Sequence, residues 1–258
     1  MAIINLTPDS FYDGNKYFET SDVMRDIEEK LAQGADIIDL GAMSSRPGSS
    51  EITLEEEWNR LTGTLKQCRK EFPDTFISID TYRSEIAKRA AEFGADIIND
   101  IGGGNLDSKM HQTISEIQIP YILMHMQGNP KIMQENPTYQ NVTTEVKDFF
   151  KNSIAKFEAL NFNKIIIDPG FGFGKTLEHN YTLLKNLEEY TSLGFPVLAG
   201  VSRKSMINKI IQTNPVSALN GTTVLNTIAL LNGAKILRVH DVLEAKQAIE
   251  LVYYFKNV

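Results

Sequence analysis

The sequence predicts an α/β fold, namely a single-domain (β/α)8 TIM barrel that spans residues 1–258. Two observations predict this architecture. Short runs rich in β-branched residues alternate with amphipathic segments, and such alternation is typical of parallel strands joined by right-handed crossovers. A chain of 258 residues has the usual length of a closed barrel. An open, doubly wound sheet would show the same alternation, so it is the alternative architecture.

Eight short strands are expected along the chain. They are Ala2–Asn5, Asp36–Leu40, Phe76–Asp80, Asp96–Asn99, Pro120–Met124, Lys164–Asp168, Pro196–Ala199 and Lys235–Arg238. The helical segments between them include Ser21–Gln33, Leu54–Glu71, Ser84–Phe93, Glu145–Leu160 and Leu177–Leu193. In residues 31–39, 90–99 and 230–238 a helix ends at a glycine and an apolar strand follows at once. This weak internal repeat supports the barrel.

The composition excludes several classes of protein. Hydrophobic residues make up 42% of the chain and charged residues 23%, which is typical of globular proteins. Acidic residues outnumber basic ones by 33 to 26, which argues against a nucleic-acid partner or a membrane surface. Cys68 is the one cysteine, so no intrachain disulfide can form. With no signal-peptide pattern at the start and no apolar stretch of about 18 residues, we expect a cytoplasmic protein.

Polar side chains at the ends of several expected strands point into the barrel. In the strand ending at Asp80, Ile77 and Ile79 suit the side that faces the helices, so Asp80 faces inward. The same alternation turns further polar residues inward, namely Asn99, Asp168, Arg238 and His240. Because barrel enzymes place their sites at the carboxyl ends of the strands, these residues predict one active-site mouth.

The loops after the strands are rich in glycine and contain cations, which suits the binding of an anion such as phosphate. Gly174, Lys175 and Thr176 look like the end of a nucleotide-binding P-loop, but Pro169 stands where that motif needs glycine. Leu177 likewise excludes a dinucleotide fingerprint. None of the four histidines shows the spacing of a zinc site.

Together these motifs resemble the dihydropteroate synthase family, the folate-pathway enzymes that sulfonamides target. The matching segments are Asn5–Phe11, Ser44–Gly48, Ile79–Tyr82, Ile97–Ile101, Leu123–Pro130, Ile167–Lys175, Gly200–Met206 and Leu237–Val242. The resemblance implies a transferase in which 4-aminobenzoate displaces pyrophosphate from (7,8-dihydropterin-6-yl)methyl diphosphate and gives 7,8-dihydropteroate. It also implies magnesium as cofactor and a homodimer.

The resemblance assigns roles to individual residues. Asp80, Asp168 and Lys204 would be catalytic and, with Asn99 and Met124, would surround the pterin ring. Asn5, Arg238 and His240 would hold the diphosphate, and Asn5 would also ligate magnesium. The residues expected around 4-aminobenzoate are Phe11, Ser45, Arg46, Pro47, Phe173, Lys204 and Ser205. The chain departs from the family pattern at Ala42 and Met43, where Gly-Glu is common.

Two other functions remain open at this point. A pterin-binding methyltransferase of the methyltetrahydrofolate type would share the barrel and its pterin carboxylates. The segments Ser45–Gly48 and Ser202–Ser205 favour the synthase, because methyl transfer needs neither a diphosphate pocket nor an aminobenzoate pocket. A catalytically inactive pterin-binding protein is the third alternative.

Overall fold

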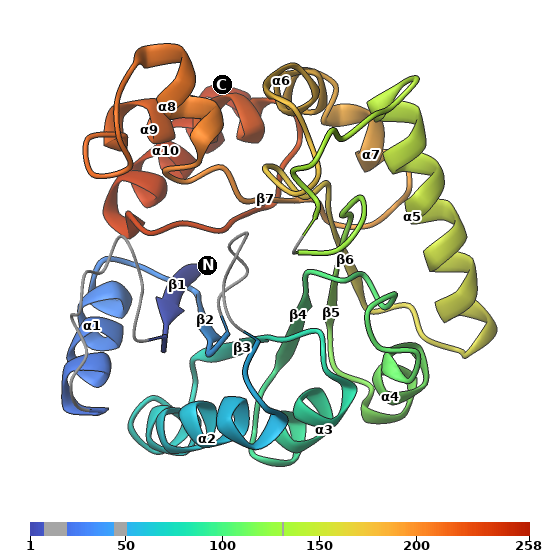
Figure 1. Ribbon diagram of the computed structural model, residues 1–258. Helices are drawn as coiled ribbons and strands as arrows, with labels where there is room; N and C mark the ends of the chain where they lie inside the picture. The colour runs from blue at the N-terminus through green and yellow to red at the C-terminus, as the bar shows by residue number, and fades with distance from the viewer. Residues whose placement is uncertain (8–19, 44–50, 131) are drawn as a thin grey trace.

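The computed structural model describes residues 1–7, 20–43, 51–130 and 132–258, and within them strands and helices alternate along the chain (Figure 1). The strands are β1 (Ala2–Asn5), β2 (Ile37–Gly41), β3 (Phe76–Asp80), β4 (Ile97–Asp100), β5 (Tyr121–Met124), β6 (Ile165–Asp168), β7 (Leu198–Ala199) and β8 (Ile236–Leu237). The helices are α1 (Thr20–Ala32), α2 (Leu54–Glu71), α3 (Ser84–Glu92), α4 (Met110–Ile117), α5 (Val142–Ala159), α6 (Leu177–Lys185), α7 (Glu188–Thr191), α8 (Ser205–Ile211), α9 (Leu219–Leu231) and α10 (Val242–Lys256).

The strands lie in the order of the sequence, and each pairs with its neighbour in parallel. β1 to β6 form one sheet, and β7 pairs with β8. Single parallel bridges join the two sheets, from Ile167 to Val197 on one side and from Ala2 to Val239 on the other. The eight strands therefore form a ring with the helices outside it, as Figure 1 shows, and the predicted (β/α)8 barrel is confirmed.

Alternation along the strands separates two layers of apolar residues. Outward side chains such as Ile38, Ile77 and Ile98 belong to the large core between strands and helices. Inward side chains form a smaller cluster at the floor of the barrel, made of Met1, Ile97, Ile122 and Leu198 with Ile37, Ile166 and Ile236 against it. This inner cluster confirms that Asn99, Asp168 and Arg238, each two residues after a member of it, face inward.

Local sequence sets where several helices begin. Thr53, Asn141 and Thr176 precede α2, α5 and α6, and each side chain accepts a hydrogen bond from the backbone N–H three residues further on. Such caps satisfy N–H groups that the first turn of a helix leaves unpaired. The cap at Asn141 explains why α5 begins at Val142, three residues before its expected start.

The helix expected over Leu177–Leu193 is wrong as one element, because it is broken into α6 and α7. Asn186 ends α6, and its side-chain Nδ2 donates to Thr143 Oγ1 at 3.1 Å. The partner lies on α5, so this contact depends on tertiary structure and the helical pattern of the sequence does not reveal it. The last two strands are also shorter than expected, although the bridges at Val197 and Val239 extend their pairing.

No helix in the described part of the chain is long and apolar enough to cross a membrane.

The loop after β6 passes very close to the loop after β5. Gly170 adopts φ +71°, and a Cβ atom at this position would lie 2.0 Å from the carbonyl oxygen of His125. Glycine is therefore required here for two reasons, the left-handed backbone and the close approach. Gly194 has a similar φ of +82°, but a Cβ there would meet nothing within 4 Å.

We expect Gly170→Ala to lower the free energy of unfolding by roughly 3 kcal/mol or more, because backbone strain and overpacking add. Gly194→Ala carries only the backbone strain and should cost about 1–2 kcal/mol. Urea denaturation of both variants measures the difference. Equal losses would contradict the tight approach of the two loops.

Candidate functional site

The ends of the strands bring the predicted polar residues to one mouth of the barrel. Asp80 pairs in register with Gly41 of β2 and Asn99 of β4, and Met124 pairs with Asp168. Asn5 ends β1 beside the same Gly41. Asn99, Met124 and Asp168 are buried, while Asn5 and Asp80 are partly exposed. The register thus places these residues together at the carboxyl ends of the strands, as the sequence predicts.

Arg238 forms the centre of the charged network at this mouth. Its Nε donates to Asp39 Oδ2 at 2.7 Å, and its Nη2 donates to Asp80 Oδ2 at 2.7 Å. Asn99 Nδ2 donates to the same Asp39 oxygen at 3.1 Å. The other carboxylate oxygen of Asp39 and the hydroxyl of the neighbouring Ser78 are buried without a hydrogen-bond partner. The floor of the site therefore has acceptor capacity that the protein itself does not use.

Burial shifts the ionisation of this network. Burial raises the pKa of Asp80 to about 7, although the positive charge of Arg238 opposes the shift. Burial lowers the pKa of Arg238, but Asp39 and Asp80 outweigh it and raise that pKa above its ordinary value. Arg238 is thus a permanent cation, and Asp80 is a carboxyl group that exchanges its proton near neutral pH.

Asp168 and Lys204 are two further charged groups at this mouth, and each opposes the shift that burial causes in the pKa of the other. Lys204 Nζ donates to the carbonyl of Phe171 and lies 4.8 Å from the centre of the Phe173 ring. Burial lowers the pKa of Lys204 to about 8 against the opposing charge of Asp168. Burial raises the pKa of Asp168, while Lys204 and the N–H of Gly170 oppose the shift. A partly desolvated ammonium beside an aromatic ring suits a planar anionic ligand.

The loops after β7 and β8 are fastened to each other. The backbone N–H of His240 donates to Ser202 Oγ at 3.2 Å. Arg203 forms a bidentate pair with Asp241, with distances of 2.8 and 2.6 Å. These contacts hold Lys204 and His240 on adjoining loops, and Ser205 follows as the exposed first residue of α8. The two loops form one rigid rim of the mouth.

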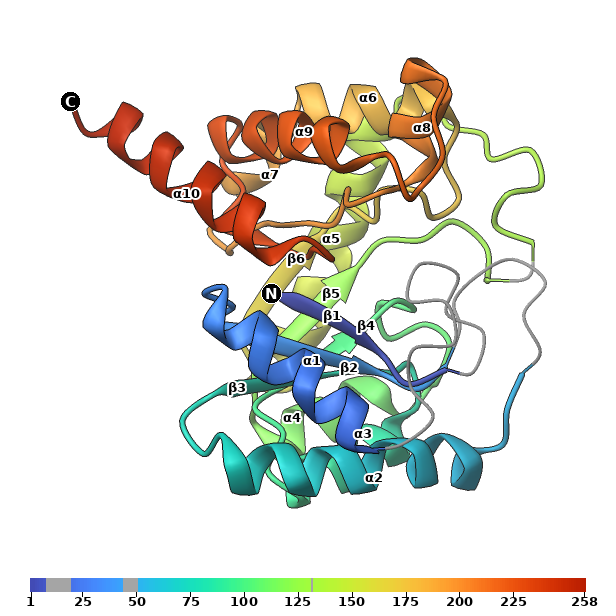
Figure 2. The same cartoon turned by 90° about the vertical axis from the view of Figure 1, so that its left-hand side faces the viewer.

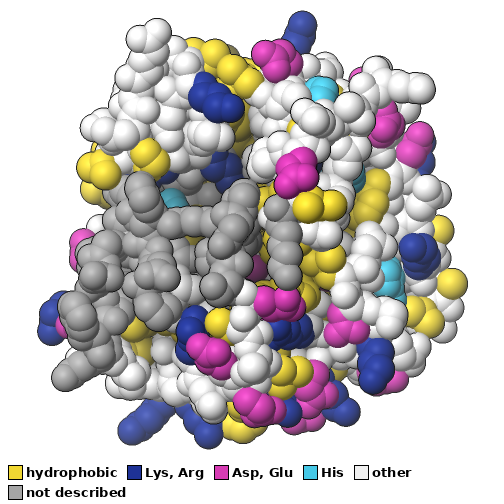
Figure 3. All heavy atoms as spheres, in the orientation of Figure 1, with side chains coloured by type: hydrophobic (Ala, Val, Ile, Leu, Met, Phe, Trp, Pro, Cys, Tyr) yellow, Lys and Arg dark blue, Asp and Glu magenta, His cyan; other side chains and the backbone are white. Residues whose placement is uncertain are grey.

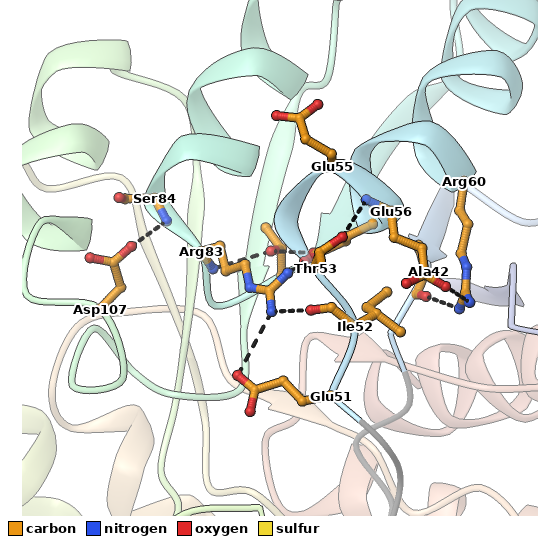
Figure 4. A network of polar contacts seen from close by, with 12 residues as sticks. Ala42, Glu51, Ile52, Thr53, Glu55, Glu56, Arg60, Arg83, Ser84 and Asp107 are labelled. Carbon is orange, nitrogen blue, oxygen red and sulfur yellow. Dashed lines mark hydrogen bonds and ion pairs between the residues drawn. The ribbon is translucent and has the colours of Figure 1, made fainter.

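Four of the predicted residues, Phe11, Ser45, Arg46 and Pro47, lie outside the described residues. The chain on either side of residues 44–50 is held by charged side chains (Figure 4). Arg60 Nη1 donates to the carbonyl of Ala42 at 3.2 Å, and Arg83 Nη2 donates to that of Ile52 at 2.6 Å. Arg83 also pairs with the buried Glu57 at 3.0 Å. Both flanks of this loop are therefore tied to α2 and to the start of α3.

Figure 3 shows acidic and basic side chains interspersed over α2 and α3 along this face. Neither sign forms a large patch there.

Residues of the described part offer one fitting donor for magnesium. No three or more His, Cys, Asp or Glu side chains are gathered there in a way that could hold a metal ion. Magnesium, however, commonly binds to one or two protein oxygens and completes its shell with phosphate and water. The carboxamide oxygen of Asn5, at the mouth beside the cationic groups, is a donor of this kind.

Sequence reasoning missed Asp39, His125, Lys175 and Glu57. Asp39 follows the inward-facing Ile37 by two residues, so the alternation that identified Asp80 could have found it. Lys175 Nζ lies 3.0 Å from His125 Nδ1, in a buried contact between two loops that no spacing in the sequence indicates. Glu57 is buried on a helix, where its pairing with Arg83 is equally invisible to a local pattern.

Comparison with known proteins identifies the family. Residues 1–240 match the family described as pterin binding enzyme. The chain is 41% identical over 254 residues to dihydropteroate synthase of Escherichia coli (strain K12), covering 98% of this chain and 89% of that protein. A crystal structure of Yersinia pestis dihydropteroate synthase with a sulfonamide drug complex superposes with a TM-score of 0.96 at 36% identity, covering 100% of this chain and 94% of that one.

A dihydropteroate synthase structure from Xanthomonas albilineans with 4-aminobenzoic acid is also similar. It superposes with a TM-score of 0.92 at 32% identity and covers 100% of this chain and 93% of that one. The matches extend over nearly the whole chain and include the strand ends that carry the charged mouth. The chain therefore belongs to the pterin binding enzyme family, among the dihydropteroate synthases.

Proposed function

We propose that this chain is a folate-pathway transferase that condenses (7,8-dihydropterin-6-yl)methyl diphosphate with 4-aminobenzoate to 7,8-dihydropteroate and pyrophosphate. The observation that carries the proposal is the convergence of Asp80 and Asp168 with Lys204 and Arg238 at one mouth. This arrangement offers acceptors for a heterocycle beside cations for its diphosphate. Relatives with this activity share about 40% of their residues with the chain.

The pterin ring would lie against the inward carboxylates. Its amino group and ring N–H groups are donors that pair with Asp80 and Asp168, and Asn99 supplies both a donor and an acceptor. Met124, buried beside Asp168 in register, would contact the face of the ring. The unpartnered oxygen of Asp39 keeps the floor below the ring favourable for polar groups.

The diphosphate would bind at the cationic rim. Arg238 is permanently charged, and His240 follows it by two residues on the same side of the chain. Magnesium, held by Asn5 and the diphosphate, would neutralise charge on the leaving group when it is bound. The fastened loops after β7 and β8 keep Lys204 and His240 in place while the diphosphate departs.

The chemical step is a dissociative substitution. The bond from the pterin methylene to the diphosphate oxygen breaks, and its electron pair leaves with the diphosphate. The positive charge left on the methylene spreads into the pterin ring, where Asp80 and Asp168 stabilise it. The neutral amine of 4-aminobenzoate then forms the new C–N bond and releases one proton. No covalent bond to the protein is needed.

The 4-aminobenzoate would stand between Phe173 and the alkyl part of Lys204, with Ser205 near its carboxylate. Phe11, Ser45, Arg46 and Pro47 are assigned to the same pocket by their positions in the family's motifs. Because sulfonamides carry a similar aniline ring, we propose that they compete at this pocket.

One assay separates the candidate functions. Pyrophosphate release by the synthase requires both 4-aminobenzoate and magnesium, whereas a methyltransferase or an inactive pterin-binding protein releases none. We expect Lys204→Ala to reduce turnover by about 100-fold or more, as loss of a transition-state cation does. Lys209→Ala, at an exposed position of α8, is the matched control and should keep normal turnover. Normal turnover in Lys204→Ala would remove Lys204 from the site.

Binding of the pterin should depend on pH through Asp80. The ionised carboxylate accepts the pterin donors, so affinity is highest above the pKa of about 7 and is lost as the pH falls through it. We expect a loss of up to about tenfold per pH unit below that value. Calorimetry with a pterin that lacks diphosphate measures the affinity.

Asp80→Asn should bind more weakly and with a flatter pH profile. Asp74→Asn, an exposed aspartate just before β3, should keep the profile of the original protein. An unchanged profile in Asp80→Asn would assign the pH dependence to another group.

We also propose that the enzyme works in the cytoplasm as a homodimer that pairs through α9 and α10. Exposed apolar side chains gather on these helices, among them Val224, Ile228 and Leu251, with Tyr254 and Phe255 near the C-terminal end. Figure 2 shows the end of α10 reaching away from the body of the molecule. A surface of this kind supports pairing with a second copy, because exposed apolar area costs free energy in water.

Charge introduced on this face should therefore weaken the dimer. Leu251 is 73% exposed, and we expect Leu251→Glu to shift the mass measured by light scattering from dimer to monomer. Ile132→Glu places the same charge at an exposed apolar residue in the loop after β5 and should leave the mass unchanged. A dimer that survives Leu251→Glu at micromolar concentration would exclude this face.

A further inference from the structure

Lys175 is a buried ammonium that the proposed reaction does not use. Its residue is 4% exposed, at the end of the loop between β6 and α6. Its Nζ donates to the carbonyls of Phe173 at 2.9 Å and His125 at 3.3 Å, and it lies 3.0 Å from His125 Nδ1. These three contacts match the three donors of an ammonium group. Lys175 thus ties the loop after β5 to the loop after β6.

Burying the charged ammonium of Lys175 in this contact costs folding free energy. Burial lowers the pKa of Lys175 to about 7, although Asp168 opposes the shift. Burial and the neighbouring Lys175 charge lower the pKa of His125 well below its usual range, so His125 is neutral and its Nδ1 accepts. The hydrogen-bond partners of Lys175 are neutral acceptors, which offset only part of the desolvation of an ammonium. A methionine of similar shape would avoid that cost, although it would leave the acceptors of this contact without their donor.

The hydrogen bonds of Lys175 hold the turn that carries Phe173. Lys175 Nζ donates to the Phe173 carbonyl, while Lys204 Nζ donates to the Phe171 carbonyl two residues earlier. The Phe173 ring lies 4.8 Å from Lys204 Nζ. The two lysines therefore hold two carbonyls of the same turn, and the position of the Phe173 ring relative to Lys204 depends on both contacts.

We propose that Lys175 is a positioning residue for the aminobenzoate pocket, acting through the Phe173 carbonyl and His125. The inference rests on the proposed function, because that function makes Phe173 and Lys204 walls of this pocket. Lys175 touches neither substrate. Its loss should weaken the binding of 4-aminobenzoate more than that of the pterin diphosphate. Of the proposed partners of the pterin diphosphate, Asp80 and Arg238 lie on or after other strands, and only Asp168 lies on the strand before this turn.

The test is steady-state kinetics of Lys175→Met with each substrate varied in turn. We expect KM for 4-aminobenzoate to rise by about tenfold or more, as loss of a supporting contact commonly produces. KM for the pterin diphosphate should change by less than about threefold. Lys185→Met makes the same substitution at an exposed lysine of α6 and should match the original protein in both values.

A second variant separates placement from stability. Lys175→Met leaves His125 Nδ1 buried without a donor, which lowers the thermal midpoint. The double variant His125→Phe with Lys175→Met removes that nitrogen, so it should recover part of the lost thermal stability and have a higher thermal midpoint than Lys175→Met. The Phe173 carbonyl remains untethered, so KM for 4-aminobenzoate should stay high.

The outcomes distinguish the inference from the function on which it rests. Absence of turnover in the original protein overturns the proposed function. If the original protein turns over normally, three results overturn the inference alone. Two concern Lys175→Met, namely unchanged KM values or an equal rise in KM for both substrates. The third is a double variant in which KM for 4-aminobenzoate returns to the original value together with the thermal midpoint. If neither variant folds, Lys175 is required for folding itself, and this result would also overturn the inference.

Discussion

The ion pairs of Arg238 with Asp39 and Asp80 are the interaction on which the site depends. They join the end of β8 to β2 and β3, across the part of the ring where single bridges replace continuous pairing. Removing two carboxylates and a guanidinium from water is expensive, and apolar side chains of similar volume often stabilise a core better. Such a network at the floor of a mouth is thus better explained by ligand binding than by stability. It supplies a fixed cation of the kind that the proposed departure of the diphosphate needs.

The sequence was sufficient to predict the barrel and the inward direction of its polar strand ends. The reason is that the pleat of a strand has a period of two residues, which no tertiary contact overrides. Asp80, Asn99 and Asp168 follow directly from it, and the inner cluster of Ile97, Ile122 and Leu198 is the structural counterpart. Asp39 obeys the same rule and was missed because it precedes the end of its strand by two residues.

Other features could not be predicted from local pattern, because their partners are distant in sequence. The break at Asn186 depends on Thr143, and the contact of Lys175 depends on His125, 50 residues away. Lys175 looked like part of a nucleotide-binding motif that the sequence does not complete. The aminobenzoate pocket came only from the family resemblance, since Ser45, Arg46 and Pro47 carry no periodic signal and lie outside the described residues.

The groups around the mouth share one electrostatic property that Arg238 does not have. Burial raises the pKa of Asp80 to about 7 and lowers the pKa of Lys204 to about 8. Burial pushes acids and bases toward the same pH because it disfavours charge of either sign. Near neutral pH these groups gain or lose protons at little free-energy cost when a charged ligand enters, while Arg238 keeps its charge. One fixed cation among adjustable neighbours suits the proposed reaction, in which the mouth holds a diphosphate, then a cationic pterin, then a product whose one negative charge is the carboxylate of its aminobenzoate part.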